Sequence, residues 1–124
     1  MSSNKLKVGF AGFGVVGKKR FKVIQDNSHF ETIAISDIRF EDDDYLNKEK
    51  KFITNSEIKI YNDYKKLLNE NLDVLFVSLP NHLAPKATIK GLNKKLHVFC
   101  EKPPGRNVKD IKDVIKVEKN NPSL

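Results

Sequence analysis

The sequence predicts an α/β fold: a doubly wound parallel sheet of about five strands between two layers of helices, a three-layer αβα arrangement. Two observations lead to this prediction. Short apolar runs alternate along the chain with segments of helical periodicity, which is typical of consecutive βαβ units. One run, "LDVLFVSLP", is almost continuously apolar, as expected of a parallel strand covered on both faces, so we expect it in the middle of the sheet.

Three strands are predicted in the first half of the chain. The first is "LKVGFAG", from Leu6, and a helix with a basic, solvent-facing side follows it over residues 15 to about 26. The second is "ETIAISD", which ends at Asp37; the acidic segment "EDDDYLNKEKK" behind it is too polar for the core and predicts an exposed loop or a short helix. The third is "EIKIY", after which Asn62 or Asp63 can cap a two-turn helix in "NDYKKLLNEN".

The second half continues the alternation. After the apolar fourth strand, "PNHLAPKATIKGLNKK" predicts a helix closed by Gly91 or Asn93, and "LHVFCEKPP" predicts the fifth strand. The segment "NVKDIKDVIKVEK" predicts a last amphipathic helix. Its apolar face consists of Val108, Ile111, Val114 and Ile115.

Composition limits the class of protein. The 124 residues, 39% hydrophobic and 31% charged, predict one globular domain over residues 1–124. No apolar run reaches the roughly 20 residues of a membrane span, and the N-terminus lacks a secretory h-region, which indicates a cytoplasmic protein without a membrane partner. The net charge of +7 comes from lysines spread along the chain, which indicates a solvated surface rather than a nucleic-acid partner.

Metal and disulfide sites are not predicted. Cys100 has no second cysteine to pair with, and His29, His82 and His97 show no metal-ligand spacing. The four acids at residues 41–44 are interpreted as solvated, and Cys100 as a small buried residue at the end of a strand.

A glycine-rich loop follows the first strand. Gly12, Gly14 and Gly17 have the spacing with which a first glycine permits a tight turn, a second lets the backbone approach a pyrophosphate, and a third lets helix and strand pack closely. The helix behind the loop directs its free N–H groups toward the phosphates. The loop therefore predicts a Rossmann-type domain that binds a dinucleotide.

The end of the second strand predicts which dinucleotide. Asp37 lies twenty residues after Gly17, where a carboxylate accepts hydrogen bonds from the adenosine ribose and repels a 2′-phosphate. Asp37 thus favours NAD over NADP. Arg39 weakens this preference because it can turn toward a 2′-phosphate, so NADP stays open.

Two further segments, "VSLPNHLAPKATIKGL" and "KKLHVFCEKP", carry a family resemblance. With the glycine loop, they resemble the Gfo/Idh/MocA oxidoreductases, which show a Pro-Asn step after the fourth strand and Glu-Lys-Pro after the fifth. The resemblance covers residues 5–117. It implies that Lys102 is catalytic, lying beside nicotinamide and substrate, where its charge stabilises an oxyanion or lowers the pKa of a substrate hydroxyl. Glu101 and Pro103 would position Lys102 and the cofactor.

The resemblance also places residues after the fourth strand on the nicotinamide side. His82 occupies a position that family members commonly fill without a catalytic role, and Ala84, followed by Pro85, stands where many members have a histidine. The loop and the resemblance together predict these cofactor-binding residues: Gly12, Phe13, Gly14, Val15, Val16, Gly17, Asp37, Arg39, Leu79, Pro80, Asn81, His82, Glu101, Lys102 and Pro103.

The function implied by the resemblance is hydride transfer between a nicotinamide and a hydroxyl or carbonyl of a sugar, polyol or nucleotide-sugar. The family's C-terminal substrate domain is absent from this sequence, so we expect the chain alone to bind NAD or NADP without turnover. A free-standing module that binds a dinucleotide or nucleotide-sugar without catalysis is the alternative, and an interaction domain with a vacant site is a third hypothesis. Monomer and homo-oligomer both stay open.

Overall fold

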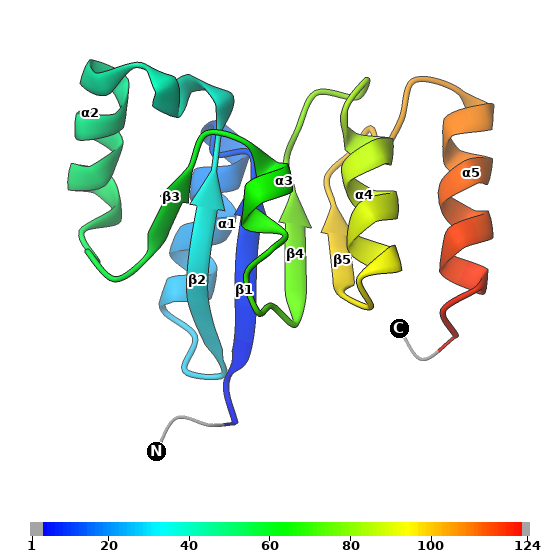
Figure 1. Cartoon of the computed structure of the whole chain (residues 1–124), viewed down its shortest axis with the longest axis horizontal. Helices are drawn as coiled ribbons and strands as arrows, with labels where there is room; N and C mark the ends of the chain where they lie inside the picture. Colours follow the sequence, from blue (N-terminus) through cyan, green and yellow to red (C-terminus); the bar gives the residue numbers. More distant parts are fainter. Residues whose placement is uncertain (1–3, 123–124) are drawn as a thin grey trace.

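The computed structural model describes residues 4–122 and contains one parallel sheet (Figure 1). Its strand order is β3-β2-β1-β4-β5, and all four pairings are parallel. The strands are β1 (Leu6–Ala11), β2 (Phe30–Ser36), β3 (Lys59–Tyr61), β4 (Val74–Val77) and β5 (His97–Cys100). The predicted five-stranded parallel sheet is confirmed, but its central strand is β1; the apolar β4 lies one place away, between β1 and β5.

Helices cover both faces of the sheet, as a doubly wound fold requires. They are α1 (Val15–Gln25), η1 (Ile38–Glu41), α2 (Asp43–Ile53), α3 (Tyr64–Leu67), α4 (Ala84–Asn93) and α5 (Val108–Lys119). Side chains from α1, η1 and α2 build the core on one face of the sheet, and side chains from α3 and α4 build the core on the other. Helix α5 packs beside α4 (Figure 1).

The acidic segment after β2 differs from the loop or short helix that its polarity predicted. It forms η1 and then the eleven-residue α2. The Asp42 carboxylate caps α2 by accepting from the N–H groups of Asp44 and Tyr45, and two acids in the first turn suit the positive end of the helix dipole. Glu49 and Ile53 are buried. The Glu49 carboxylate is 2.8 Å from Lys18 Nζ, which compensates its buried charge.

The α3 and α4 segments also refine the predictions. Helix α3 has one turn rather than two, and Asp63, not Asn62, is its N-cap, because the Asp63 carboxylate accepts from the N–H of Lys65. Helix α4 ends at Asn93, so Gly91 is an interior residue. A Cβ at Gly91 would lie 2.9 Å from Leu75 Cδ2, and this glycine therefore lets α4 pack closely on the sheet.

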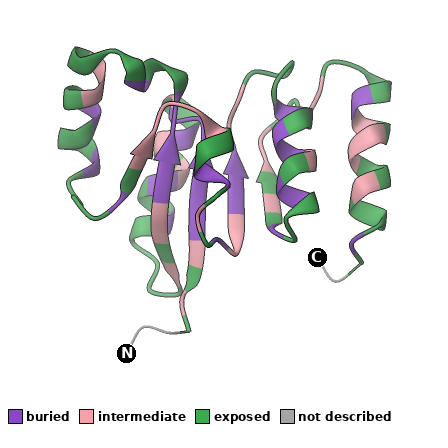
Figure 2. Cartoon of the chain, in the orientation of Figure 1, coloured by how far each residue is buried: buried purple, intermediate pink, exposed green. Residues whose placement is uncertain are grey.

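The C-terminal side of the domain is less covered than its apolar pattern predicted (Figure 2). Val108 of α5 is 69% exposed and Ile115 is also exposed, while Asp110 is the buried residue of this helix. Phe99 in β5 is 48% exposed. The reason is topological: β5 pairs only with β4 and lies at the edge of the sheet, and α5 contacts the domain mainly through α4.

Candidate functional site

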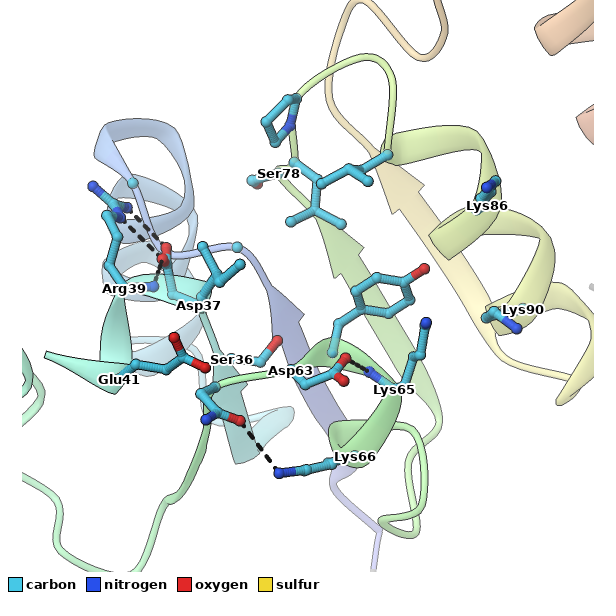
Figure 3. Close-up of a pocket in the computed structure, with 18 of the residues that line it drawn as sticks. Ser36, Asp37, Arg39, Glu41, Asp63, Lys65, Lys66, Ser78, Lys86 and Lys90 are labelled. Carbon is cyan, nitrogen blue, oxygen red and sulfur yellow. Dashed lines mark hydrogen bonds and ion pairs between the residues drawn. The ribbon is translucent and has the colours of Figure 1, made fainter.

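A cavity of about 1100 Å³ opens at the carboxyl ends of the central strands (Figure 3). Its walls come from the loop after β1, the segment after β2, the segment after β4, and helices α3 and α4. The chain leaves β1 toward β2 on one side, whereas β4 pairs with β1 on the other, so the strand order reverses here. Ligands of open α/β sheets bind at such a switch point.

Two of the three loop glycines are required by the fold itself. Gly12 has a φ of +94°, and a Cβ there would lie 2.3 Å from the carbonyl oxygen of Ser78. A Cβ at Gly17 would lie 2.6 Å from the carbonyl oxygen of Gly12. Gly12 therefore permits the turn beside β4, and Gly17 permits α1 to pack against that turn.

Gly14 differs from its two neighbours because the protein leaves the space around it open. Its backbone is extended, at φ −81° and ψ −157°, which any residue can adopt. A Cβ there would meet only Arg39 Nη2, at 3.6 Å. Gly14 is the N-cap of α1 and offers no side chain to the free N–H groups of the first turn. The open space in front of a helix N-terminus fits a pyrophosphate.

Asp37 lines the cavity just after β2, and its side chain is 8% exposed. Oδ2 accepts from the N–H of Phe13 at 2.9 Å and from Arg39 Nη2 at 2.8 Å. Oδ1 accepts from the N–H and from the Nε of Arg39, both at 2.9 Å. Burial raises the pKa of this carboxyl, but the hydrogen bonds and the Arg39 charge outweigh burial and hold the pKa below 3.8.

Arg39 is held in a fixed orientation by two partners. Its guanidinium forms the bidentate pair with Asp37, and its Cζ lies 4.7 Å from the centroid of the Tyr45 ring. Such stacking of a guanidinium on an aromatic face is favourable. The hydrogen bond to Asp37 raises the pKa of Arg39 further above its ordinary value, so Arg39 remains charged.

The lowered pKa of Asp37 predicts a pH-dependent contribution to stability. Because the folded-state pKa is depressed, this contribution is present above the unfolded-state pKa and is lost as the pH falls through the folded-state pKa, that is, below 3.8. We expect Asp37→Asn to lower the free energy of unfolding by about 2 kcal/mol at neutral pH. Urea denaturation of both proteins between about pH 6 and pH 2 should show this difference shrinking with acid; a difference that stays constant would contradict the prediction.

Apart from Glu101, the predicted cofactor-binding residues fall into three groups. The cavity is lined by six of them: Gly12, Gly14, Asp37, Arg39, Leu79 and Pro80. Phe13 lies in the core, so only its backbone N–H reaches the site, and Gly17 is buried behind the loop. Exposed positions that do not line the cavity are Val15, Val16, Asn81, His82, Lys102 and Pro103.

Glu101 is engaged with α1 rather than with the cavity. Its carboxylate accepts from Nε of Arg20 and, at 3.2 Å, from Nη2. The Arg20 guanidinium in turn lies over the Phe99 ring, 5.4 Å from its centroid. This pair connects the end of β5, one residue before Lys102, to α1.

Cys100 is half-buried at the end of β5, and burial raises the pKa of its thiol. A raised pKa disfavours the thiolate, which agrees with the interpretation of Cys100 as a structural residue.

The cavity also contains residues that the sequence analysis did not single out. Tyr64 and Lys65 come from α3, while Leu83, Lys86 and Lys90 come from the α4 region. The last three recur at helical spacing, three and four residues apart. This periodicity, at a helix that starts beside a ligand-bearing loop, is the signal that could have identified them.

Two classes of feature are not found among the described residues. No helix within residues 4–122 is both long and apolar enough to cross a membrane. In the same part of the chain, no three histidine, cysteine or acidic side chains are grouped so that they could hold a metal ion.

A parallel sheet with this strand order, a glycine loop at its switch point and an acid after β2 define a Rossmann-type dinucleotide-binding domain. Residues 6–123 match the GFO_IDH_MocA family, described as "Oxidoreductase family, NAD-binding Rossmann fold". The chain therefore belongs to this family, as the glycine loop and the Pro-Asn and Glu-Lys-Pro segments predicted.

Several relatives agree with this assignment. The chain is 31% identical over 118 residues to myo-inositol 2-dehydrogenase of Thermotoga maritima, a match that covers 92% of this chain and 33% of the relative. Among solved structures, myo-inositol 2-dehydrogenase from Lactobacillus plantarum superimposes with a TM-score of 0.82 at 27% identity, over 97% of this chain and 34% of that one.

A third relative shares the fold at lower identity. Scyllo-inositol dehydrogenase from Lactobacillus casei, whose structure contains NAD(H) and scyllo-inositol, gives a TM-score of 0.83 at 23% identity, over 97% of this chain and 34% of that one. The chain thus spans about a third of the length of the relatives that it matches.

Proposed function

We propose that this chain is the cofactor-binding part of an NAD(P)-dependent oxidoreductase that acts on a hydroxyl or carbonyl of a sugar, polyol or nucleotide-sugar. The observation that carries the proposal is Gly14: the fold leaves open the space that a dinucleotide pyrophosphate needs, directly in front of the N-terminus of α1. The relatives named as inositol dehydrogenases support the polyol class of substrate.

The residues present fit a nicotinamide dinucleotide, which supplies the hydride chemistry when bound. Gly12, Gly14 and the first turn of α1 bind the pyrophosphate through backbone N–H groups. Asp37 and Arg39 hold the adenosine end of the cleft. Leu79 and Pro80, together with Asn81 and His82, orient the nicotinamide end.

Lys102 is the proposed catalytic residue. It follows the carboxyl end of β5, on the same side of the parallel sheet as the glycine loop that follows the carboxyl end of β1, and its side chain is exposed. An ammonium at this edge can contact a substrate oxygen, stabilise negative charge on it and lower the pKa of the hydroxyl. Glu101, through its ion pair with Arg20, positions the segment that carries Lys102.

The proposal predicts cofactor binding without turnover by the 124-residue chain. Titration with NADH, followed by nicotinamide fluorescence and by calorimetry, should give saturable one-to-one binding. Assays with NAD and myo-inositol, scyllo-inositol or glucose should give no NADH, because the chain spans about a third of the length of the relatives and, under this proposal, the remaining part supplies the substrate-binding groups. A folded chain that binds no NADH contradicts the proposal. Substrate oxidation by the chain alone contradicts the part of the proposal by which this chain binds only the cofactor.

The alternative, a binding module without catalysis, makes a different prediction for a longer protein. A longer protein, in which this chain is followed by the part that corresponds to the rest of the relatives, should catalyse NAD-dependent oxidation under our proposal. Under the alternative, it should not. Lys102→Met in such a protein should reduce kcat and leave the affinity for NADH largely unchanged, because the lysine acts on the substrate.

A further inference from the structure

We propose that Arg39, held between Asp37 and Tyr45, makes the adenosine end of the cleft accept NADP(H) at least as well as NAD(H). The inference rests on the proposed function and concerns the same site. It departs from the usual consequence of an acid after β2, which is rejection of the 2′-phosphate. The departure follows from how the Asp37 carboxylate is already used inside the protein.

The first step concerns hydrogen-bond capacity. An ionised carboxylate has about four lone-pair positions, two on each oxygen. Asp37 accepts four hydrogen bonds, two on each oxygen: one from the N–H of Phe13 and three from the backbone and side chain of Arg39. Asp37 therefore has no acceptor position left for the two hydroxyls of an adenosine ribose in this arrangement.

The second step concerns charge. The Asp37 carboxylate is paired with the Arg39 guanidinium at 2.8 Å, so the negative charge that would repel a 2′-phosphate is compensated. The guanidinium has five N–H donors, of which the pair uses only Nε and one on Nη2. The Arg39 side chain is 51% exposed. The group that the end of β2 presents to a ligand is thus a guanidinium, which binds phosphate well.

The third step concerns position. Arg39 Nη2 would lie 3.6 Å from a Cβ at Gly14, so the guanidinium borders the space assigned to the pyrophosphate. Stacking on Tyr45 restricts its movement. A preoriented donor group loses little conformational entropy when a ligand binds, which favours affinity.

The fourth step concerns the electrostatic field produced by all the charged side chains that line the cavity. On the wall opposite Arg39, α3 and α4 contribute four cations (Figure 3): Lys65, Lys66, Lys86 and Lys90. Within residues 4–122, none of these four forms an ion pair. The carboxylates that line the cavity besides Asp37 are Glu41 and Asp63. Cations outnumber acids, and such a field favours the dinucleotide with the larger negative charge.

The experiment compares the dissociation constants of NADH and NADPH for the full chain and three variants. Arg39→Gln removes the charge, and Arg39→Lys retains it without the planar fork. Arg106→Gln is the matched control, because Arg106 donates to Asp110 through the same kinds of atom, namely its backbone N–H, Nε and Nη2, and does not line the cavity. Far-UV circular dichroism verifies that each variant is folded.

We expect the unmodified chain to bind NADPH with a dissociation constant equal to or below that for NADH. Arg39→Gln should raise the dissociation constant for NADPH by about tenfold or more and change that for NADH by less than about threefold. The affinity of Arg39→Lys for NADPH should lie between those of the unmodified chain and Arg39→Gln. Arg106→Gln should change neither the affinity for NADPH nor that for NADH. The affinity for NADPH should also fall more steeply with added salt than that for NADH.

Three results would overturn the inference. The first is NADPH binding about tenfold weaker than NADH to the unmodified chain, which would mean that Arg39 turns aside and Asp37 binds the ribose. The second is an equal loss of affinity for NADH and NADPH in Arg39→Gln, which would mean that Arg39 has a structural role and does not select the 2′-phosphate. In either case NADH still binds and the proposed function stands. The third is a folded chain that binds neither cofactor, which overturns the proposed function as well.

Discussion

Replacing Gly14 with valine is expected to weaken NADH binding by about 100-fold or more. The reason is steric: the backbone at Gly14 borders the open space in front of α1, and a branched side chain there occupies the position of the pyrophosphate. The fold should persist, because the extended backbone of Gly14 suits any residue and, among the described residues outside its own segment, the nearest atom to an added Cβ is Arg39 Nη2 at 3.6 Å. Calorimetric titration with NADH measures the loss.

Gly14→Ala is the matched control for size. Its single methyl group should give a smaller loss of NADH affinity than the valine side chain. The free energy of unfolding of Gly14→Ala should fall by no more than about 1 kcal/mol, the typical difference between a good N-cap residue and alanine. Unchanged NADH affinity in Gly14→Val would show that the dinucleotide, if bound, does not use this loop.

Replacing Gly12 with alanine is expected to destabilise the fold by about 3 kcal/mol. Two effects act together at this position. Its φ of +94° is costly for any residue with a Cβ, and that Cβ would lie 2.3 Å from the carbonyl oxygen of Ser78. Neither backbone segment can shift easily, because the N–H of Gly12 donates to the carbonyl of Ser36 and the N–H of Ser78 donates to the carbonyl of Ala11.

Urea denaturation followed by far-UV circular dichroism measures this effect. Gly14→Ala again serves as the control, since it makes the same chemical change two residues away. We expect a much larger fall in the denaturation midpoint for Gly12→Ala than for Gly14→Ala. Equal midpoints for the two variants would contradict the distinction between a glycine needed by the fold and one needed by the ligand.

Local patterns in the sequence were sufficient for most of the fold. Strand and helix periodicity located all five strands, and the spacing of Gly12, Gly14 and Gly17 located the loop. These features depend on residues close together in the chain, where backbone preference and hydrophobic period act directly. The length of α2 was not predicted, because its apolar side chains pack on core residues distant in the chain and its buried Glu49 pairs with Lys18 of α1.

The candidate site was predicted as a set of residues but not as an arrangement. Six of the fifteen predicted cofactor-binding residues line the cavity, and the lysines of α3 and α4 joined them only through the packing of those helices. The apolar face predicted for α5 is partly exposed, and so is Phe99 of β5, because both elements lie at the edge of the sheet. Neither outcome is encoded in a short segment.

Sequence alone thus predicted the Rossmann-type fold from local periodicity, and the family from the resemblance of three short motifs, and both predictions are confirmed. The roles within the loop came from contacts between distant segments. Gly12 packs against Ser78, which is sixty-six residues later in the chain, and the Phe13 N–H donates to Asp37, which is twenty-four residues later. Those contacts separate the glycines that the fold needs from Gly14, and they pair the Asp37 carboxylate with the N–H of Phe13 and with the backbone and side chain of Arg39, a neighbour that only the tertiary structure orients.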